Sequence, residues 1–276
     1  MASLADLRKE IQAARRKLTT IARLLAEYER AQRARHDPFA LERLLQQLEK
    51  QGRDAPLGPE TRERLRRWLE YERTLLREQR RTYQVQFVQE LQAKLRPLGF
   101  SLEGHLPRLY AGLYQILPSF EQGTVKITWG PEPVASLKGL DPGRVAQAIQ
   151  KHEKALKRPF VAEEFFRLLQ QAYRRARQEA GPDRRVPLAL VHRHLTLLLQ
   201  PRTFWQNPVR TRFREYPRSF FAYDLYRLRQ SSLGDRVRLY VATFDQTRDP
   251  SQALFVPDSA QRGTRYAYLS LEPEEA

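Results

Sequence analysis

The sequence predicts a mainly α protein with α+β parts, and three observations lead to this class. A heptad pattern of apolar residues occupies the first 28 positions, as in a long helix or a coiled coil. Charged residues make up 29% of the chain while only 12 of 276 residues are glycine, a balance that favours helices over an all-β sandwich. Strand-like alternation is confined to the middle and the end. We therefore expect a helical coiled-coil region at 1–99, a small α+β segment at 100–158 and a C-terminal domain at 159–276.

The first helix carries the clearest periodic signal of the chain. Its apolar residues alternate spacings of three and four without interruption, which forms a coiled-coil seam of Leu4, Leu7, Ile11, Ala14, Leu18, Ile21, Leu25 and Tyr28. Such a narrow apolar stripe suits a partner helix better than a globular core. The seam therefore predicts self-association or the docking of a partner protein.

Two further helices are expected before residue 100. The first helix is expected to end at Asp37–Pro38, since a residue that precedes proline avoids the helical conformation. The next begins at Pro38 and ends at Gly52. The other runs from Pro59 to Pro97. Arginines stand between its apolar positions, and they form either a solvated face paired with glutamates or a row of phosphate contacts: Arg62, Arg64, Arg66, Arg67, Arg73, Arg77, Arg80 and Arg81.

The middle segment loses the heptads. Residues 108–117 and 124–129 are expected to be strands, the second ending at a turn rich in glycine and proline. A helix is expected to follow from Asp141–Pro142, with Asp141 as its N-cap.

The C-terminal domain has a different order of elements. Amphipathic patterns predict helices at 160–180, from Pro187 to about Leu199, and from Pro217 to Ser232. Strands are expected afterwards at 237–242, 253–256 and 266–271. The polar and aromatic stretch between the last two helices is unusually long. We expect its aromatic residues Phe204 and Trp205 to pack under the stretch, with stacking on bases as the alternative.

This order of three helices and a strand pair, carried by Pro187–Leu199, Pro217–Ser232 and Val237–Leu271, resembles the winged-helix branch of the helix-turn-helix superfamily. The resemblance implies that the third helix enters the major groove of DNA. It implies base contacts by Arg218, Ser219, Tyr223 and Arg227. Phosphate contacts would come from Arg210, Arg212 and Arg214, with Arg248 or Arg262 near the wing. The long stretch from Pro201 to Tyr216 and the long strand connections depart from the usual pattern.

The charge balance indicates a polyanionic partner. With 49 lysines and arginines against 32 acids, the formal charge is +17, and the excess is spread along the whole chain. We expect nucleic acid as the partner, DNA before RNA. The N-terminus lacks the apolar core of a signal peptide, and no apolar run reaches the ~18 residues of a membrane span. A soluble, cytoplasmic protein is expected, without a membrane partner and associated with the nucleoid if bacterial.

Residue patterns of catalysis are absent from the sequence. There is no cysteine, which excludes disulfides, thiolate zinc sites and cysteine nucleophiles, and no glycine-rich phosphate loop occurs. His192 and His194 stand two apart on a predicted helix and cannot hold one metal together. Glu121 or Glu132 with Lys126 or Lys138 lacks the second acid that a metal-dependent nuclease needs. We expect no catalytic residue, no cofactor and no metal site.

The hypothesis is therefore a non-catalytic protein that binds double-stranded DNA through arginine-rich surfaces and a C-terminal winged helix. An alternative is an assembly subunit of a DNA-maintenance or defence complex whose ATPase or nuclease is another chain. A weaker alternative is a protein associated with RNA or the ribosome.

Overall fold

The computed structural model describes residues 3–34, 37–249 and 251–272, and it confirms the mainly α class with α+β parts. Helices hold 60% of the residues and strands 18%, so helix dominates. The chain divides into two compact units. The first unit comprises 1–99, 117–125 and 136–146, and the second comprises 100–116, 126–135 and 147–276. Within the described ranges, no helix combines the length and the apolarity needed to cross a membrane.

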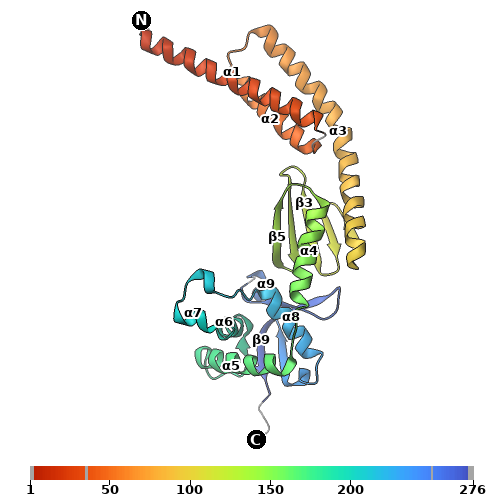
Figure 1. Cartoon of the computed structure of the whole chain (residues 1–276), viewed down its shortest axis with the longest axis vertical. Helices are drawn as coiled ribbons and strands as arrows, with labels where there is room; N and C mark the ends of the chain where they lie inside the picture. The colour runs from red at the N-terminus through yellow and green to blue at the C-terminus, as the bar shows by residue number, and fades with distance from the viewer. Residues whose placement is uncertain (1–2, 35–36, 250, 273–276) are drawn as a thin grey trace. The chain divides into compact units, whose positions relative to one another are not determined.

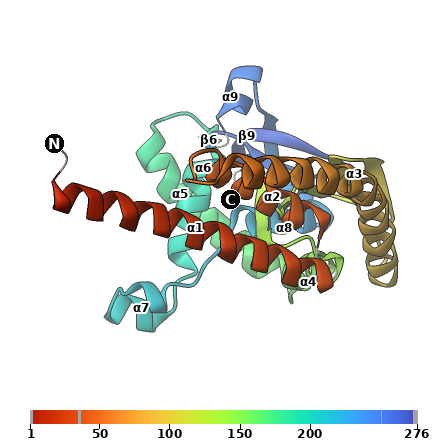
Figure 2. The same cartoon turned by 90° about the horizontal axis from the view of Figure 1, so that it is seen from above.

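Three long helices form most of the first unit: α1 (Leu4–Arg33), α2 (Pro38–Arg53) and α3 (Pro59–Leu95). They lie side by side in both views (Figure 1 and Figure 2). Ser3 and Asp6 form a capping box at the start of α1, and the Asp37 side chain caps α2. A short 3-10 turn, η1 (Arg96–Leu98), closes α3. The predicted second and third helices are thus confirmed, with small shifts at their ends.

The core of the first unit lies where these three helices meet. Its buried residues come from all three helices and, with Ala55, from the connection between α2 and α3: Ile21, Leu24, Tyr28, Ala31, Leu41, Leu45, Leu48, Ala55, Leu69 and Leu76. The Tyr28 ring meets Trp68 edge-on at 5.3 Å between centroids, and its hydroxyl donates to the buried Glu72 carboxylate at 2.8 Å. Burial, with Glu72 beside it, raises the pKa of the Tyr28 hydroxyl. Tyr28 therefore joins α1 to α3 through packing and through a hydrogen bond.

The predicted seam of α1 has two different surroundings. Of its eight residues only Ile21 and Tyr28 are buried, and Ala14 is half-buried. The others are exposed: Leu4, Leu7, Ile11, Leu18 and Leu25. A helix rises 1.5 Å per residue, so the 30 residues of α1 extend far beyond the 16 of α2. The seam packs inside this unit only over the last part of α1, and the coiled coil stays a prediction.

A five-stranded sheet follows α3, in the order β1-β2-β3-β4-β5. Its strands are β1 (Leu102–His105), β2 (Arg108–Ala111), β3 (Tyr114–Ser119), β4 (Thr124–Trp129) and β5 (Glu132–Lys138). The single strand expected at 108–117 is wrong, because Gly112 turns the chain at a φ of +59° and separates β2 from β3. The unpredicted β5 contains Pro133, which an edge strand tolerates. The helix expected from Asp141–Pro142 is confirmed as α4 (Pro142–Leu156).

The second unit contains the C-terminal elements. Their helices are α5 (Ala162–Ala180), α6 (Leu188–Leu198), α7 (Arg202–Gln206), α8 (Arg218–Arg229) and α9 (Phe244–Arg248). Two 3-10 turns accompany them, η2 (Arg210–Arg212) and η3 (Gly234–Arg236). The strands are β6 (Val186–Pro187), β7 (Val237–Val241), β8 (Leu254–Pro257) and β9 (Gly263–Leu271). The three helices and three strands expected from the sequence are confirmed here.

Strand β9 organises the C-terminal sheet. It pairs antiparallel with β6, β7 and β8, so that the order is β6-β9-β7 with β8 also on β9. The two-residue strand β6 pairs Val186 with Leu269, which places it between α5 and α6 at the edge of the sheet. Helices α5, α6 and α8 bury their apolar faces together, with Leu169, Leu195 and Leu225 fully inside. This packing leaves the segment between α6 and α8 as a separate extension.

Candidate nucleic-acid interface

Residues 201–216, which we call the insert, form a loop between α6 and α8 that is held by its own hydrogen bonds and ring contacts. Gln200 is buried and clamps its far end: its Oε1 accepts from the Arg214 backbone N–H at 2.8 Å, and its Nε2 donates to the Arg214 carbonyl at 2.9 Å. Inside the loop, the ring of Phe204 packs against that of Phe213 at 5.7 Å between centroids. Arg212 Nη1 donates to the Thr203 carbonyl at 3.3 Å. The insert is therefore held by its own contacts, and α7 extends from the body of the unit in both views (Figure 1 and Figure 2).

The outer surface of the insert is basic and aromatic. Arg202, Arg210 and Arg214 are exposed, and none of the three has an acidic partner among the residues that the structure describes. The indole of Trp205 is 58% exposed beside them. The expectation that both aromatic residues pack under the stretch is therefore wrong for Trp205, whose ring meets Phe204 edge-on at 5.3 Å between centroids but stays mostly exposed. An exposed ring among unpaired guanidinium groups is the chemistry that binds phosphates and stacks on bases.

The residues expected to contact bases lie on α8, where their side chains are turned into the interior of the second unit. Arg218 on α8 donates from Nε to Glu132 at 2.9 Å and from Nη2 to the Ala253 carbonyl. Ser219 is 3% exposed, and its hydroxyl lies 3.2 Å from His152 Nε2. The ring of Tyr223 is half-buried and meets Trp129 edge-on at 6.4 Å between centroids. These three side chains are therefore occupied by contacts within the unit.

Arg227 belongs to a buried ionic network centred on Asp224. Asp224 is 3% exposed and accepts hydrogen bonds from the Tyr216 hydroxyl at 2.7 Å, from Arg158 and from Arg227. Arg227 also donates to the Arg158 carbonyl at 2.7 Å and stacks on the ring of Phe160. Burial, with Asp224 beside it, raises the pKa of the Tyr216 hydroxyl well above its usual range. This network joins three segments: the residues that follow α4, the end of the insert, and α8. Arg227 therefore stabilises the packing of this unit.

The two arginines expected near the wing differ in their surroundings. Arg248 on α9 is exposed, stacks on Phe244 and pairs with Asp245 at 3.6 Å. Arg262 lies in the turn between β8 and β9, exposed and without an acidic partner in the described part of the chain. Of these two arginines, Arg262 is therefore the one that is exposed without an acidic partner among the described residues.

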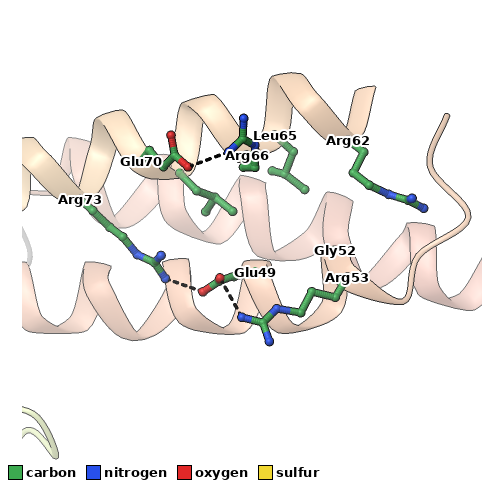
Figure 3. A pocket seen from close by; sticks show the side chains of 9 residues that line it. Glu49, Gly52, Arg53, Arg62, Leu65, Arg66, Glu70 and Arg73 are labelled. Atoms are coloured by element: carbon green, nitrogen blue, oxygen red, sulfur yellow. Dashed lines mark hydrogen bonds and ion pairs between the residues drawn. The ribbon is translucent and has the colours of Figure 1, made fainter. Parts of the chain in front are cut away.

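A second basic region lies between α2 and α3, around a pocket of about 250 Å³ (Figure 3). Glu49 accepts from Arg73 at 2.7 Å and from Arg53 at 3.0 Å, and these two guanidinium groups lower the pKa of the Glu49 carboxyl. Arg66 lies 3.4 Å from Glu70. Among the arginines that line the pocket only Arg62 has no ion pair with a described acid, and it donates to the Ala55 carbonyl. Because most of its cations are paired, this pocket is a weaker phosphate site than the insert.

Another hydrogen-bonded chain connects Ser219 to His152 in the interior. His152 Nδ1 lies 2.9 Å from the Tyr114 hydroxyl, and that hydroxyl lies 2.9 Å from Glu153. A serine beside a histidine is also the arrangement of an activated nucleophile, but Ser219 is buried and offers no surface to a substrate. In the described ranges no cluster of three or more histidine and acidic side chains could hold a metal ion.

His152 predicts a pH-dependent stability. Burial lowers its pKa to about 4, and Glu153 offsets part of this effect. The unfolded chain, with an ordinary pKa of about 6.5, binds the proton first, so stability should fall as the pH decreases from about 6.5 toward 4. In urea unfolding at pH 7, 6 and 5, His152→Gln should lose less stability on acidification than the parent chain. His105→Gln, on exposed β1, is the control and should follow the parent; identical curves for both variants would contradict the assignment.

Comparisons with known proteins give no relative from which a role could be transferred. No protein-family model matches the chain, and neither a curated protein nor a solved structure is similar enough to count as a match. The site must therefore be judged on its own chemistry. Sequence reasoning missed Arg202, the exposure of Trp205 and the clamp by Gln200; the unusual length of the insert was the available signal.

Proposed function

We propose that the protein is a non-catalytic nucleic-acid-binding protein that binds duplex DNA, with the insert at the centre of its interface. The observation that carries this proposal is the set of exposed, unpaired guanidinium groups of Arg202, Arg210 and Arg214 around the exposed indole of Trp205. A structural role does not account for these cations, since they pair with no described acid. The net charge of +17 attracts polyanions to the chain as a whole, and these three arginines provide a specific surface where a phosphate backbone could bind.

The second unit, in this proposal, contains a winged-helix domain over residues 162–271. Its support is the order of elements: the helices α5, α6 and α8 are followed by strands β7 and β9 with a long connection between them. In winged helices the third helix enters the major groove. Here α8 packs against other parts of its unit through Arg218, Ser219 and Tyr223. The proposal therefore assigns phosphate contacts to the insert, to Arg262 and to Arg248 on α9.

The experiment is a titration of the full chain into a fluorescently labelled random-sequence DNA duplex, followed by anisotropy at salt concentrations from about 50 to 200 mM. Binding should weaken steeply with salt, because each neutralised phosphate releases counterions and contributes about 0.9 to the slope of log affinity against log salt. A structured RNA and a single-stranded DNA of the same length are run in parallel.

The outcomes separate the hypotheses. Tightest binding to the DNA duplex supports the proposal, and tightest binding to single-stranded DNA, whose bases are free to stack on Trp205, overturns the duplex assignment. Preference for structured RNA overturns the DNA assignment in favour of an RNA-associated protein. No binding to any of the three at 50 mM salt overturns nucleic-acid binding altogether and favours an assembly subunit.

A further inference from the structure

The first half of α1 exposes a continuous apolar seam. Leu4, Leu7, Ile11 and Leu18 are 86%, 52%, 61% and 41% exposed, although they follow the same heptad register as the buried Ile21. Single exposed leucines are ordinary on protein surfaces, but a row of them along one helix face indicates an interaction surface. The helix has the capping box that stabilises its start, so this seam is presented on a formed helix.

The seam becomes exposed where the other helices of the first unit end. Lys17 Nζ donates at 2.9 Å to the carbonyl of Asp54, which lies in the connection between α2 and α3. That contact marks how far the connection reaches along α1. No residue between Leu4 and Leu18 is buried, and α1 extends beyond its neighbours toward its N-terminus (Figure 1 and Figure 2). Residues 4–16 are therefore free for a partner helix.

The charges beside the seam favour a second copy in one orientation. With Leu4 and Ile11 at position a and Leu7 at position d, Glu10 occupies a g position and Arg15 the following e position. In a parallel, in-register pair, each g residue faces the next e residue of the other helix, so Glu10 meets Arg15 twice. Neither side chain has an ion-pair partner among the described residues. An antiparallel pair that aligns Leu7 with Leu18 would instead oppose Arg8 and Arg15, and it would place Glu10 opposite Lys17, whose ammonium already donates to the Asp54 carbonyl.

The core positions agree with this orientation. A β-branched residue at a, here Ile11, together with leucine at d, here Leu7, is typical of two-stranded parallel coiled coils, while Leu4 at a and Ala14 at d add no preference. The other pairs across the interface are neutral: Arg8 faces Ser3, and Lys17 faces Ala22. We propose that the exposed half of α1 pairs with α1 of a second copy as a parallel, in-register coiled coil. The exposed seam is about two heptads long, so this pairing is reversible and of modest affinity. The inference does not depend on nucleic-acid binding.

Cysteine cross-linking tests the proposal directly, because the chain contains no cysteine of its own. Leu7→Cys alone should form a disulfide-linked dimer under mild oxidation, since parallel in-register helices bring the two d positions within the ~7 Å between Cα atoms that a disulfide tolerates. Leu7 is exposed, so the substitution leaves the core intact. The matched control is Lys9→Cys, two residues along the same helix and on its opposite side, which should form no disulfide-linked dimer.

Two results would overturn the proposal. Cross-linking of a mixture of Leu7→Cys and Leu18→Cys chains, without self-linking of either, indicates an antiparallel pair. No linkage of Leu7→Cys beyond that of Lys9→Cys excludes a second copy on this seam.

Sedimentation of charge variants provides an independent readout. Glu10→Arg or Arg15→Glu alone places like charges opposite each other twice and should raise the dimer dissociation constant about tenfold. An equimolar mixture of the two variants should recover dimers, because each protomer then offers the charge that the other lacks. Absence of recovery would contradict the parallel register.

Discussion

Replacing Arg202, Arg210 and Arg214 together with alanine is expected to lower the affinity for duplex DNA by at least about tenfold at 50 mM salt. All three guanidinium groups are exposed and lack an acidic partner in the described structure, so their removal breaks no ion pair of the fold. The slope of log affinity against log salt should decrease by up to about 2.7, since each lost phosphate contact removes about 0.9. Anisotropy titrations at four salt concentrations measure both quantities.

The matched control separates a local interface from the general charge of the chain. Arg167, Arg175 and Arg177 on α5 are also exposed, and replacing them with alanine removes the same charge from the same unit. This variant should lose affinity only slightly and keep the parent slope. Equal losses in the two triple variants would mean that the DNA responds to net charge alone, and the insert would have no special role.

The order of helices and strands was predictable because it depends on local signals. Pro38 begins α2 as expected, and the alternation expected over 266–271 lies within the observed strand β9. The α1 seam shows what local signals could not predict, namely which of its residues are buried. Its heptads run through Tyr28 without interruption, but where the seam passes from solvent into a core depends on the lengths of α2 and α3, which the sequence of α1 does not contain.

The candidate site was predictable only in part, for a similar reason. Arg210, Arg212 and Arg214 were expected as phosphate contacts and do lie on the exposed insert. Arg218 and Arg227 carry the same side chain and the same charge, but Glu132 and Asp224 occupy them. Glu132 lies 86 residues from Arg218, so only the tertiary structure could show that pair. Asp224 stands three residues before Arg227 on α8, a local spacing that could have indicated the second pair. An exposed tryptophan could not be distinguished from a core tryptophan without the tertiary structure.

Asp224→Asn is expected to have the largest effect on stability of any single substitution considered for this chain. The change keeps the size of the side chain but leaves Arg158 and Arg227 without their acidic partner, and it replaces one acceptor of the Tyr216 hydroxyl. Removing one partner of a buried ion pair costs about 3–5 kcal/mol. The two arginine side chains are 26% and 19% exposed and stack on aromatic rings, so we expect a loss near 3 kcal/mol. Thermal unfolding should show a decrease in Tm of roughly 6–12 °C.

Two further variants test whether the network, and not the change of side chain, causes this loss. Asp245→Asn makes the same substitution in an exposed ion pair with Arg248, and it should change stability by less than about 0.5 kcal/mol. Combining Asp224→Asn with Arg227→Met removes one of the two guanidinium groups that Asp224→Asn leaves without an acidic partner. The double variant should therefore lose less stability than the sum of the two single losses. Additive losses would show that Asp224 and Arg227 act separately. Since Tyr216 ends the insert and its hydroxyl donates to the same carboxylate as Arg227, Asp224 contacts both the end of α8 and the base of the proposed interface.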